Sequence, residues 1–297
     1  MVLTRREIRD ATLAGRVVES MALAEQLQGC LTRREAKLLA VLPYLDVKGE
    51  ILELGAFQGK CSIILAKSAL AAGVDRTYAC DPLLPLSSTL PVEARVSDVN
   101  LPQGLHENLE AHGVADVVEF YRMKSSELAR SWNRPLKCLW IDGDHRHSGI
   151  SADVQLFSRF LVPGAVICVQ GVLRKCGGPT RVFAEQVVMS ESYGDCGICG
   201  SVGWAQYIGD DLVVQKQWEQ KVALYRRLSR LVPYLVLSEK KIRENTVTLK
   251  LLRSLVPRSE INPVTWLNDR NAVYRPTVDS RVFPVPLVRS MADRCAV

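Results

Sequence analysis

The chain has 297 residues, of which 47% are hydrophobic, 24% charged and 6% aromatic. This balance excludes a disordered, collagen-like or small disulfide-stapled chain, and the length suits one large domain or two modest ones. No apolar stretch approaches the ~20 residues that a membrane span needs. The charged residues of the first ten argue against an export or transit segment, so we expect a cytoplasmic protein with reduced cysteines and no membrane partner.

The net charge of +6 is unevenly distributed along the chain. Residues 212–297 carry 16 Lys and Arg against 7 Asp and Glu, a net charge of +9, whereas residues 1–211 have a net charge of −3. A basic segment can attract nucleic acid or an acidic partner, but a solvated helix face explains the same pattern and is the interpretation we favour. Aromatic and basic residues do not alternate there as they do on base-stacking surfaces, so nucleic acid is not an expected partner.

The apolar pattern changes from helical spacing to strand–helix alternation near residue 49. Leu13, Val17 and Met21 recur every four residues, which predicts helices within residues 1–48. The strands predicted next are 51–54, 77–80, 117–121, 136–141 and 165–169. The helices predicted after them are 60–71, 103–113, one from 125, 148–160 and 180–189. Two closing strands are expected at 193–198 and 202–208.

This alternation predicts an α/β fold with a doubly wound, mostly parallel seven-stranded sheet. We therefore divide the chain into an N-terminal helical segment (1–48), a central domain (49–210) and a basic extension (211–297). Within the extension, apolar stripes over 218–232 and 242–255 predict two helices, and the prolines of 257–297 predict extended chain. Doubly wound sheets bind ligands beyond the carboxyl ends of their strands, so functional residues are expected just after each strand.

The segment Glu53-Leu-Gly-Ala-Phe-Gln-Gly59 follows the first strand and opens a helix. Its glycines permit a sharp turn and a close ligand approach, and the helix amides point towards such a ligand. The spacing lacks the third glycine of the dinucleotide motif, which counts against a nicotinamide dehydrogenase. The acid two residues before Gly55 suits a cationic ligand, such as a sulfonium amino acid, better than a phosphate. A plain tight turn is the structural alternative.

Polar residues also follow the second and third predicted strands. Asp81 closes the second strand, where a carboxylate can accept both hydroxyls of a ribose. A turn-forming aspartate before Pro82 is the alternative, and the broken stretch 82–91 is a candidate lid. Ser125 or Ser126, after the third strand, would lie beside a nucleoside base, or would cap the next helix.

The richest cluster is Ile141-Asp-Gly-Asp-His145-Arg-His147, at the end of the fourth strand. Two carboxylates and two imidazoles within six residues are hard to explain as core. Asp142 and His145 together can orient and deprotonate an acceptor hydroxyl. The alternative is a polar turn before a helix that Asp144 or Ser148 caps.

These motifs, in this order, resemble the class I S-adenosylmethionine-dependent methyltransferases, and the closest subgroup is that of the macrolide sugar O-methyltransferases. The resemblance covers about residues 30–208 and includes the closing segment Gly200-Ser-Val-Gly-Trp-Ala. It implies a Rossmann-like methyltransferase fold, S-adenosylmethionine as cofactor, and O-methylation of a small-molecule or sugar hydroxyl. The cofactor-binding residues that it implies are Glu53, Gly55, Ala56, Phe57, Gly59, Lys60, Ser62, Asp81, Ser125 and Ser126, and the catalytic pair is Asp142 and His145.

One departure from the resemblance concerns a metal ion. In metal-assisted members the aspartate matching Asp142 binds a divalent ion, with further acidic ligands at the end of the fifth strand. This chain has Gln170 and Gly171 there, so Asp142 is the candidate ligand and the use of Mg²⁺ stays open. The same departure favours an alternative function, a cofactor-binding scaffold without activity. A nucleic-acid methyltransferase is a weaker alternative, and a homo-oligomer through the flanking helices is a further possibility.

Overall fold

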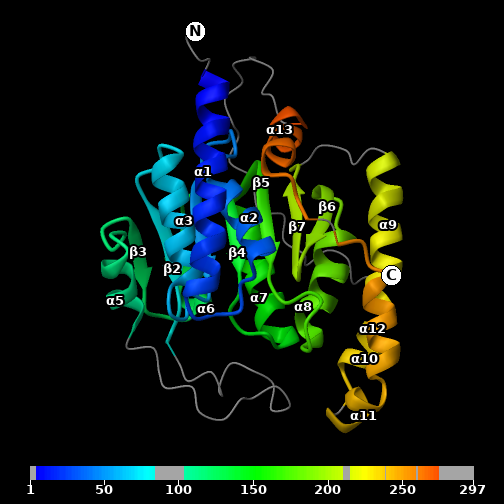
Figure 1. Ribbon diagram of the computed structural model, residues 1–297. Coiled ribbons are helices and arrows are strands. Elements are labelled where there is room, and N and C mark those ends of the chain that lie inside the picture. The colour runs from blue at the N-terminus through cyan, green and yellow to red at the C-terminus, as the bar shows by residue number, and fades with distance from the viewer. Residues whose placement is uncertain (1–4, 84–103, 210–214, 238, 259, 274–297) are drawn as a thin grey trace, which may run out of the picture.

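The computed structural model describes residues 5–83, 104–209, 215–237, 239–258 and 260–273. Its centre is a seven-stranded sheet in the order β3-β2-β1-β4-β5-β7-β6, which confirms the predicted fold (Figure 1). Neighbouring strands from β3 to β5 pair in parallel, and β7 runs antiparallel to both β5 and β6. The strands are β1 (Glu50–Leu54), β2 (Thr77–Cys80), β3 (Val118–Tyr121), β4 (Leu136–Ile141), β5 (Leu161–Val169), β6 (Tyr193–Cys199) and β7 (Val202–Tyr207).

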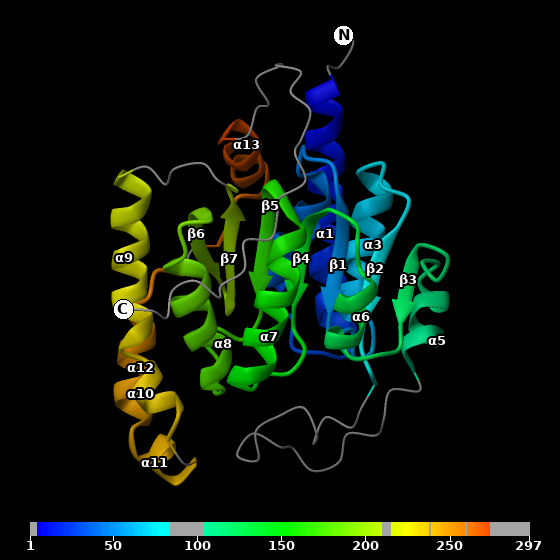
Figure 2. The ribbon, with the colours of Figure 1, turned by 180° about the vertical axis from the view of Figure 1, so that it is seen from behind.

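Helices cover both faces of the sheet. On the face seen in Figure 1 lie α1 (Arg5–Gln26), α2 (Arg33–Val41), the short 3₁₀ turn η1 (Leu42–Tyr44), α3 (Lys60–Ala71) and α5 (Gly104–Ala111). On the opposite face, seen in Figure 2, lie α6 (Ser125–Ser131), α7 (His147–Phe157), η3 (Ser158–Phe160), α8 (Gly177–Val182) and the π-helical turn η4 (Phe183–Val188).

Strand β4 shows why this sandwich forms. Its six residues are buried, with Cys138 and Trp140 in the core under α1–α3 and Leu139 and Ile141 in the core under α7 and α8. Successive side chains of a strand point to opposite faces, so the apolar run from Cys138 to Ile141 needs cover on both sides. A strand of this kind belongs in the middle of a parallel sheet, where β4 is found.

The C-terminal extension packs against both faces. Helices α9 (Gln215–Ser229), α10 (Val232–Leu235), α11 (Glu239–Glu244) and α12 (Thr246–Ser254) stand beside β6 and α8, and α13 (Pro263–Val273) packs beside α1. The single helix predicted over 242–255 is wrong, because it is broken between α11 and α12 at Asn245. No helix in the described part of the chain is long and apolar enough to cross a membrane.

Helix α13 also corrects the prediction of extended chain from residue 257. Asn262 begins this helix: its side-chain oxygen accepts the backbone N–H of Thr265 at 3.0 Å, and its carbonyl accepts that of Trp266 at 2.8 Å. Pro263 occupies the first helical position, where its missing N–H costs nothing. Pro263 therefore starts a helix, although the prolines of this segment predict extended chain. Residues 274–297 lie outside the described residues, as does most of the candidate lid from residue 84 onward.

Candidate active site

The carboxyl end of β1 leads into a turn that requires glycine. Gly55 and Gly59 have φ values of +95° and +86°. A Cβ on Gly55 would lie 2.5 Å from the carbonyl carbon of Asp142 and 2.6 Å from the nitrogen of Gly143. Ala56 is buried inside the turn, and Phe57 has a φ of +49°. The turn therefore brings the ends of β1 and β4 into direct contact.

Glu53 is a buried carboxylate with an incomplete set of partners. It is 1% exposed, and the Ser62 hydroxyl of α3 donates to its Oε2. Its Oε1 is buried with no hydrogen-bond partner among the described residues. Burial raises the pKa of Glu53 to about 8, against the opposing effect of the Ser62 hydrogen bond. An unpartnered buried oxygen at the end of β1 fits a donor group of a ligand, and a cationic donor best.

Asp81 connects the end of β2 to the glycine turn. Its Oδ2 accepts the N–H of Phe57 at 2.9 Å, and its Oδ1 accepts the N–H of Leu83 at 2.7 Å. The second of these bonds closes an Asx turn, so Asp81 is a turn-forming aspartate, as the alternative interpretation of the sequence predicts. The first helps to hold the positive φ of Phe57. A role of Asp81 in binding a ribose stays a prediction.

The polar residues after β4 fall into two groups with different contacts. His145 Nε2 lies 3.3 Å from Asp142 Oδ1, and each side chain is 20% exposed. The ring of His145 lies against Gly171, where a Cβ would come within 3.4 Å of Nε2. By contrast, Asp144 accepts the N–H and the guanidinium of Arg146 at the start of α7. Asp144 thus forms a polar turn, but neither Asp144 nor Ser148 caps α7, whose N-cap residue is Arg146. Asp142 and His145 form a pair at the sheet edge.

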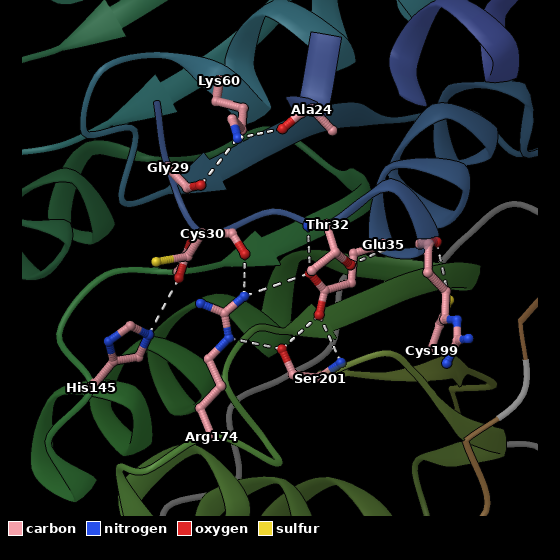
Figure 3. Close-up of polar contacts among 12 residues, drawn as sticks. Ala24, Gly29, Cys30, Thr32, Glu35, Lys60, His145, Arg174, Cys199 and Ser201 are labelled. Carbon is pink, nitrogen blue, oxygen red and sulfur yellow. Dashed lines mark hydrogen bonds and ion pairs between the residues drawn. The ribbon is translucent and has the colours of Figure 1, made fainter. Parts of the chain in front are cut away.

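Three predicted cofactor residues have other partners in the structure or face solvent. The Lys60 ammonium donates to the carbonyls of Ala24 at 2.7 Å and Gly29 at 3.0 Å (Figure 3). Ser125 donates its hydroxyl to Asp153 on α7, and Ser126 is exposed. The assignments of these residues to the cofactor stay predictions.

Asp153 is a polar residue of the site that the sequence analysis missed. It is 4% exposed, and one of its oxygens lies 3.7 Å from the place of a Cβ on Gly143. Burial raises its pKa to about 6. A signal was present, because Asp153 stands at a buried position of α7 beside Ile150 and Val154.

A second missed feature is a polar network over the same edge, which we call the Glu35 network: Thr32, Glu35, Arg174 and Ser201 (Figure 3). Glu35 is 1% exposed and accepts the backbone N–H groups of Thr32 at 2.8 Å and Ser201 at 2.7 Å. Arg174 lies 3.5 Å from Glu35 and donates to the Ser201 hydroxyl at 2.9 Å and to the Cys30 carbonyl. The network ties the α1–α2 linker (residues 27–32) to the loop after β5 and to the β6–β7 turn.

The residues at this edge do not provide the ligand set that a magnesium ion needs. No group of three or more His, Cys, Asp or Glu with metal-binding geometry occurs in the described ranges. Gln170, at the end of β5, is 1% exposed, and neither its Oε1 nor its Nε2 has a partner among the described residues. Within the segment 142–147, Asp142 alone would supply a carboxylate, since Asp144 is held by Arg146. Magnesium requires near-octahedral oxygen coordination, so we derive no step through a metal.

The fold and this edge together define a class: a doubly wound α/β domain with a glycine turn, a buried acid and a polar cluster at the carboxyl ends of its strands. Residues 52–170 match the family model described as "Methyltransferase domain". This part of the chain is therefore similar to methyltransferase domains, in agreement with the resemblance drawn from its motifs.

Similar solved structures carry related descriptions. Cofactor-bound Rv0187 from MTB is 21% identical, with a TM-score of 0.48 over 68% of this chain and 91% of that chain. An O-methyltransferase from Bacillus cereus in complex with SAH is 18% identical, with a TM-score of 0.46 over 66% and 91%. The TDP-rhamnose 3'-O-methyltransferase CalS11 of calicheamicin biosynthesis is 14% identical, with a TM-score of 0.43 over 69% and 96%.

Proposed function

We propose that the protein transfers a methyl group from S-adenosylmethionine to a hydroxyl oxygen of a small molecule or sugar. The observation that carries this proposal is the pair of Asp142 and His145, 3.3 Å apart at the end of β4. The pair adjoins the glycine turn of the methyltransferase domain, because Gly55 packs against the backbone of Asp142. A base and an orienting carboxylate therefore stand next to the place expected for the cofactor.

The residues of the turn fit S-adenosylmethionine, which supplies an electrophilic methyl group when it is bound. The unpartnered Oε1 of Glu53 suits the ammonium of its methionine part. The positive φ values of Gly55, Phe57 and Gly59 shape the backbone before α3, and the free amides at a helix N-terminus favour an anionic ligand group. Asp81, which already orders Phe57 through its backbone, stands where the resemblance places the ribose.

His145 accepts the proton of the acceptor hydroxyl, and Asp142 orients the imidazole and stabilises its charged form. A positioned base contributes roughly 10²–10⁴-fold to the rate. Displacement at a methyl group needs the oxygen, carbon and sulfur in line, so alignment supplies much of the rest. Both side chains are partly buried, each 20% exposed, and Nε2 of His145, which faces Asp142, is itself buried.

Calorimetric titration with S-adenosylhomocysteine, with and without magnesium, tests the cofactor. Binding with a dissociation constant in the micromolar range, about −8 kcal/mol, supports the proposal. Absence of binding in both buffers refutes it. A panel of hydroxylated acceptors, each paired with its O-methylated product as a standard, then tests the reaction by mass spectrometry. Binding of the cofactor product without methylation of any acceptor would instead support a scaffold that lost its chemistry.

A further inference from the structure

A pocket lies next to the loop after β5, and the proposed reaction does not use it. Its volume is about 900 Å³. It lies between the α1–α2 linker, the loop after β5 and the β6–β7 turn, which are the segments that the Glu35 network joins. Cys30 and Arg174 line it. Arg174 donates its backbone N–H to the carbonyl of Gly171, and the His145 ring lies against Gly171. The lining of this pocket is therefore joined to the segment that contacts His145.

The lining of this pocket is basic. Four arginines line it against two glutamates: Arg33, Arg34, Arg174 and Arg258, with Glu25 and Glu35. Both acids are already occupied. Glu25 pairs with Arg33 at 2.8 Å, and Glu35 accepts the Ser201 hydroxyl at 2.6 Å and two backbone N–H groups besides facing Arg174.

Arg34 and Arg258 carry the surplus positive charge. The nearest carboxylate to pair with Arg34 is that of Glu260, at 3.9 Å, and Glu260 also binds Lys37. Arg258 lies close enough to Arg253 to lower the pKa of that guanidinium, although burial lowers it more. Arginines that lie close together, while the nearby carboxylates pair with other groups, create a positive potential that favours binding of an anion.

The basic C-terminal extension is what completes this surface. Arg253 of α12 donates to the carbonyl of Arg174 at 2.9 Å, and its Nε is buried with no partner among the described residues. Arg258 follows four residues after α12 and lines the pocket itself. Part of the excess charge of residues 212–297 is thus placed next to the active site rather than on a distant helix face.

We propose that this pocket binds an anionic group, a phosphate or a carboxylate, of the methyl acceptor, and so orients the acceptor hydroxyl towards His145. The inference rests on the proposed methyl transfer for the direction of the hydroxyl, but the anion site itself does not. Arginine presents a rigid fork of N–H donors that matches both anions, which explains why guanidinium groups rather than ammonium groups line the pocket. The acceptor is then a phosphorylated or acidic molecule rather than a neutral sugar.

Calorimetry on the full chain tests the anion site without any acceptor. Inorganic pyrophosphate and citrate serve as probes for phosphate and carboxylate. The wild type is expected to bind one of them with a stoichiometry of one, and Arg258→Glu and Arg34→Glu to weaken that binding by about tenfold or more. Arg227→Glu, an equal charge change at an exposed position of α9 outside the pocket, is the matched control. Its effect should stay below about twofold.

Each outcome decides between the two proposals. No binding of either probe, or equal weakening by Arg227→Glu, overturns the anion site. Binding of S-adenosylhomocysteine without binding of either probe leaves the methyl transfer standing and refutes the anion site alone. Probe binding that depends on Arg258, without binding of S-adenosylhomocysteine, keeps the site and refutes the methyl transfer. With a methylated acceptor in hand, Arg258→Glu should raise KM for an anionic acceptor and leave KM for its neutral analogue unchanged.

Discussion

The Nε2 atom of His145 lies 3.3 Å from Asp142 Oδ1, and the ring of His145 also lies against Gly171. If its task is to accept a proton, His145→Ala should lower kcat by about 10²–10⁴-fold while the affinity for S-adenosylhomocysteine stays unchanged. The matched control is His106→Ala, because His106 is 77% exposed on α5 and pairs with Glu110. An equal loss of turnover and cofactor affinity would show that His145 is structural.

The raised pKa of Glu53 predicts that cofactor binding is coupled to the release of a proton. Because burial raises its pKa to about 8, the free protein holds this carboxyl mainly protonated at pH 7. A ligand ammonium beside Oε1 favours the charged form and lowers that pKa, so binding should release up to one proton. The affinity for S-adenosylhomocysteine should therefore rise as pH increases from about 6.5 to 8.

Titrations in two buffers with different ionisation enthalpies measure this proton release directly. Glu53→Gln, which keeps the shape and removes the ionisation, should abolish the release and weaken binding. Release that persists in this variant would assign the proton to another group. Proton uptake in the wild type would contradict a cationic ligand group next to Glu53.

For single residues, the sequence predicts where in the fold a side chain lies better than it predicts which groups that side chain contacts. Asp142, His145 and Glu53 were predicted as site residues because acids and imidazoles at strand ends have little structural use. Lys60 has the residue type and the position that the resemblance implies for a cofactor-binding residue, yet its long side chain reaches Ala24 of α1 and Gly29 of the α1–α2 linker. Such contacts depend on where a distant segment docks, which no local pattern records.

Among the elements, the turn after β1 allows a direct test of whether its glycine is required for stability and for cofactor binding. Gly55→Ala places a Cβ within 2.6 Å of backbone atoms of Asp142 and Gly143 and forces an unfavourable φ of +95°. Gly73→Ala, with a φ of +76° and nothing within 4 Å, isolates the cost of the φ alone, about 1–2 kcal/mol. Urea unfolding should show a clearly larger loss for Gly55→Ala, together with loss of cofactor affinity. Equal losses for the two variants would mean that the backbone of β4 yields without cost.

Most elements of the central sheet could be predicted, and the exceptions share a cause. Strands β2 and β4 and helix α3 match the predicted residues, since their apolar runs are long and their ends carry turn residues. The prediction failed around Asn245 and Pro263, where one residue decides between continuing, breaking and starting a helix. Asparagine and proline occur both where helices begin and where they end, so tertiary packing decides which of the two happens at a given residue.

For the whole molecule, the N-terminal helices are part of the core rather than an appendage. Their buried residues lie in the same cluster as α3 and the β1 and β4 strands, and they include Leu13, Val17, Leu23, Leu31, Leu38, Leu39, Val41 and Leu42. Arg9 of α1 also donates to Asn268 of α13 at 2.9 Å, which links the two ends of the described chain. The division drawn at residue 48 from the sequence thus follows a change of pattern, and its meaning for folding stays a prediction.

A truncated chain of residues 49–297 tests that division. Each buried leucine or valine contributes about 1.5–3 kcal/mol, so the loss from these residues, about 12–24 kcal/mol, is as large as or larger than the 5–15 kcal/mol by which domains are stable. The truncation also uncovers Ile63, Ile64 and Trp140, an apolar patch that favours aggregation. We expect no cooperative unfolding transition by circular dichroism and no binding of S-adenosylhomocysteine, whereas the full chain shows both. A cooperative transition with intact binding would establish residues 49–297 as an independent folding unit and assign the helices before it to another task, such as covering the acceptor.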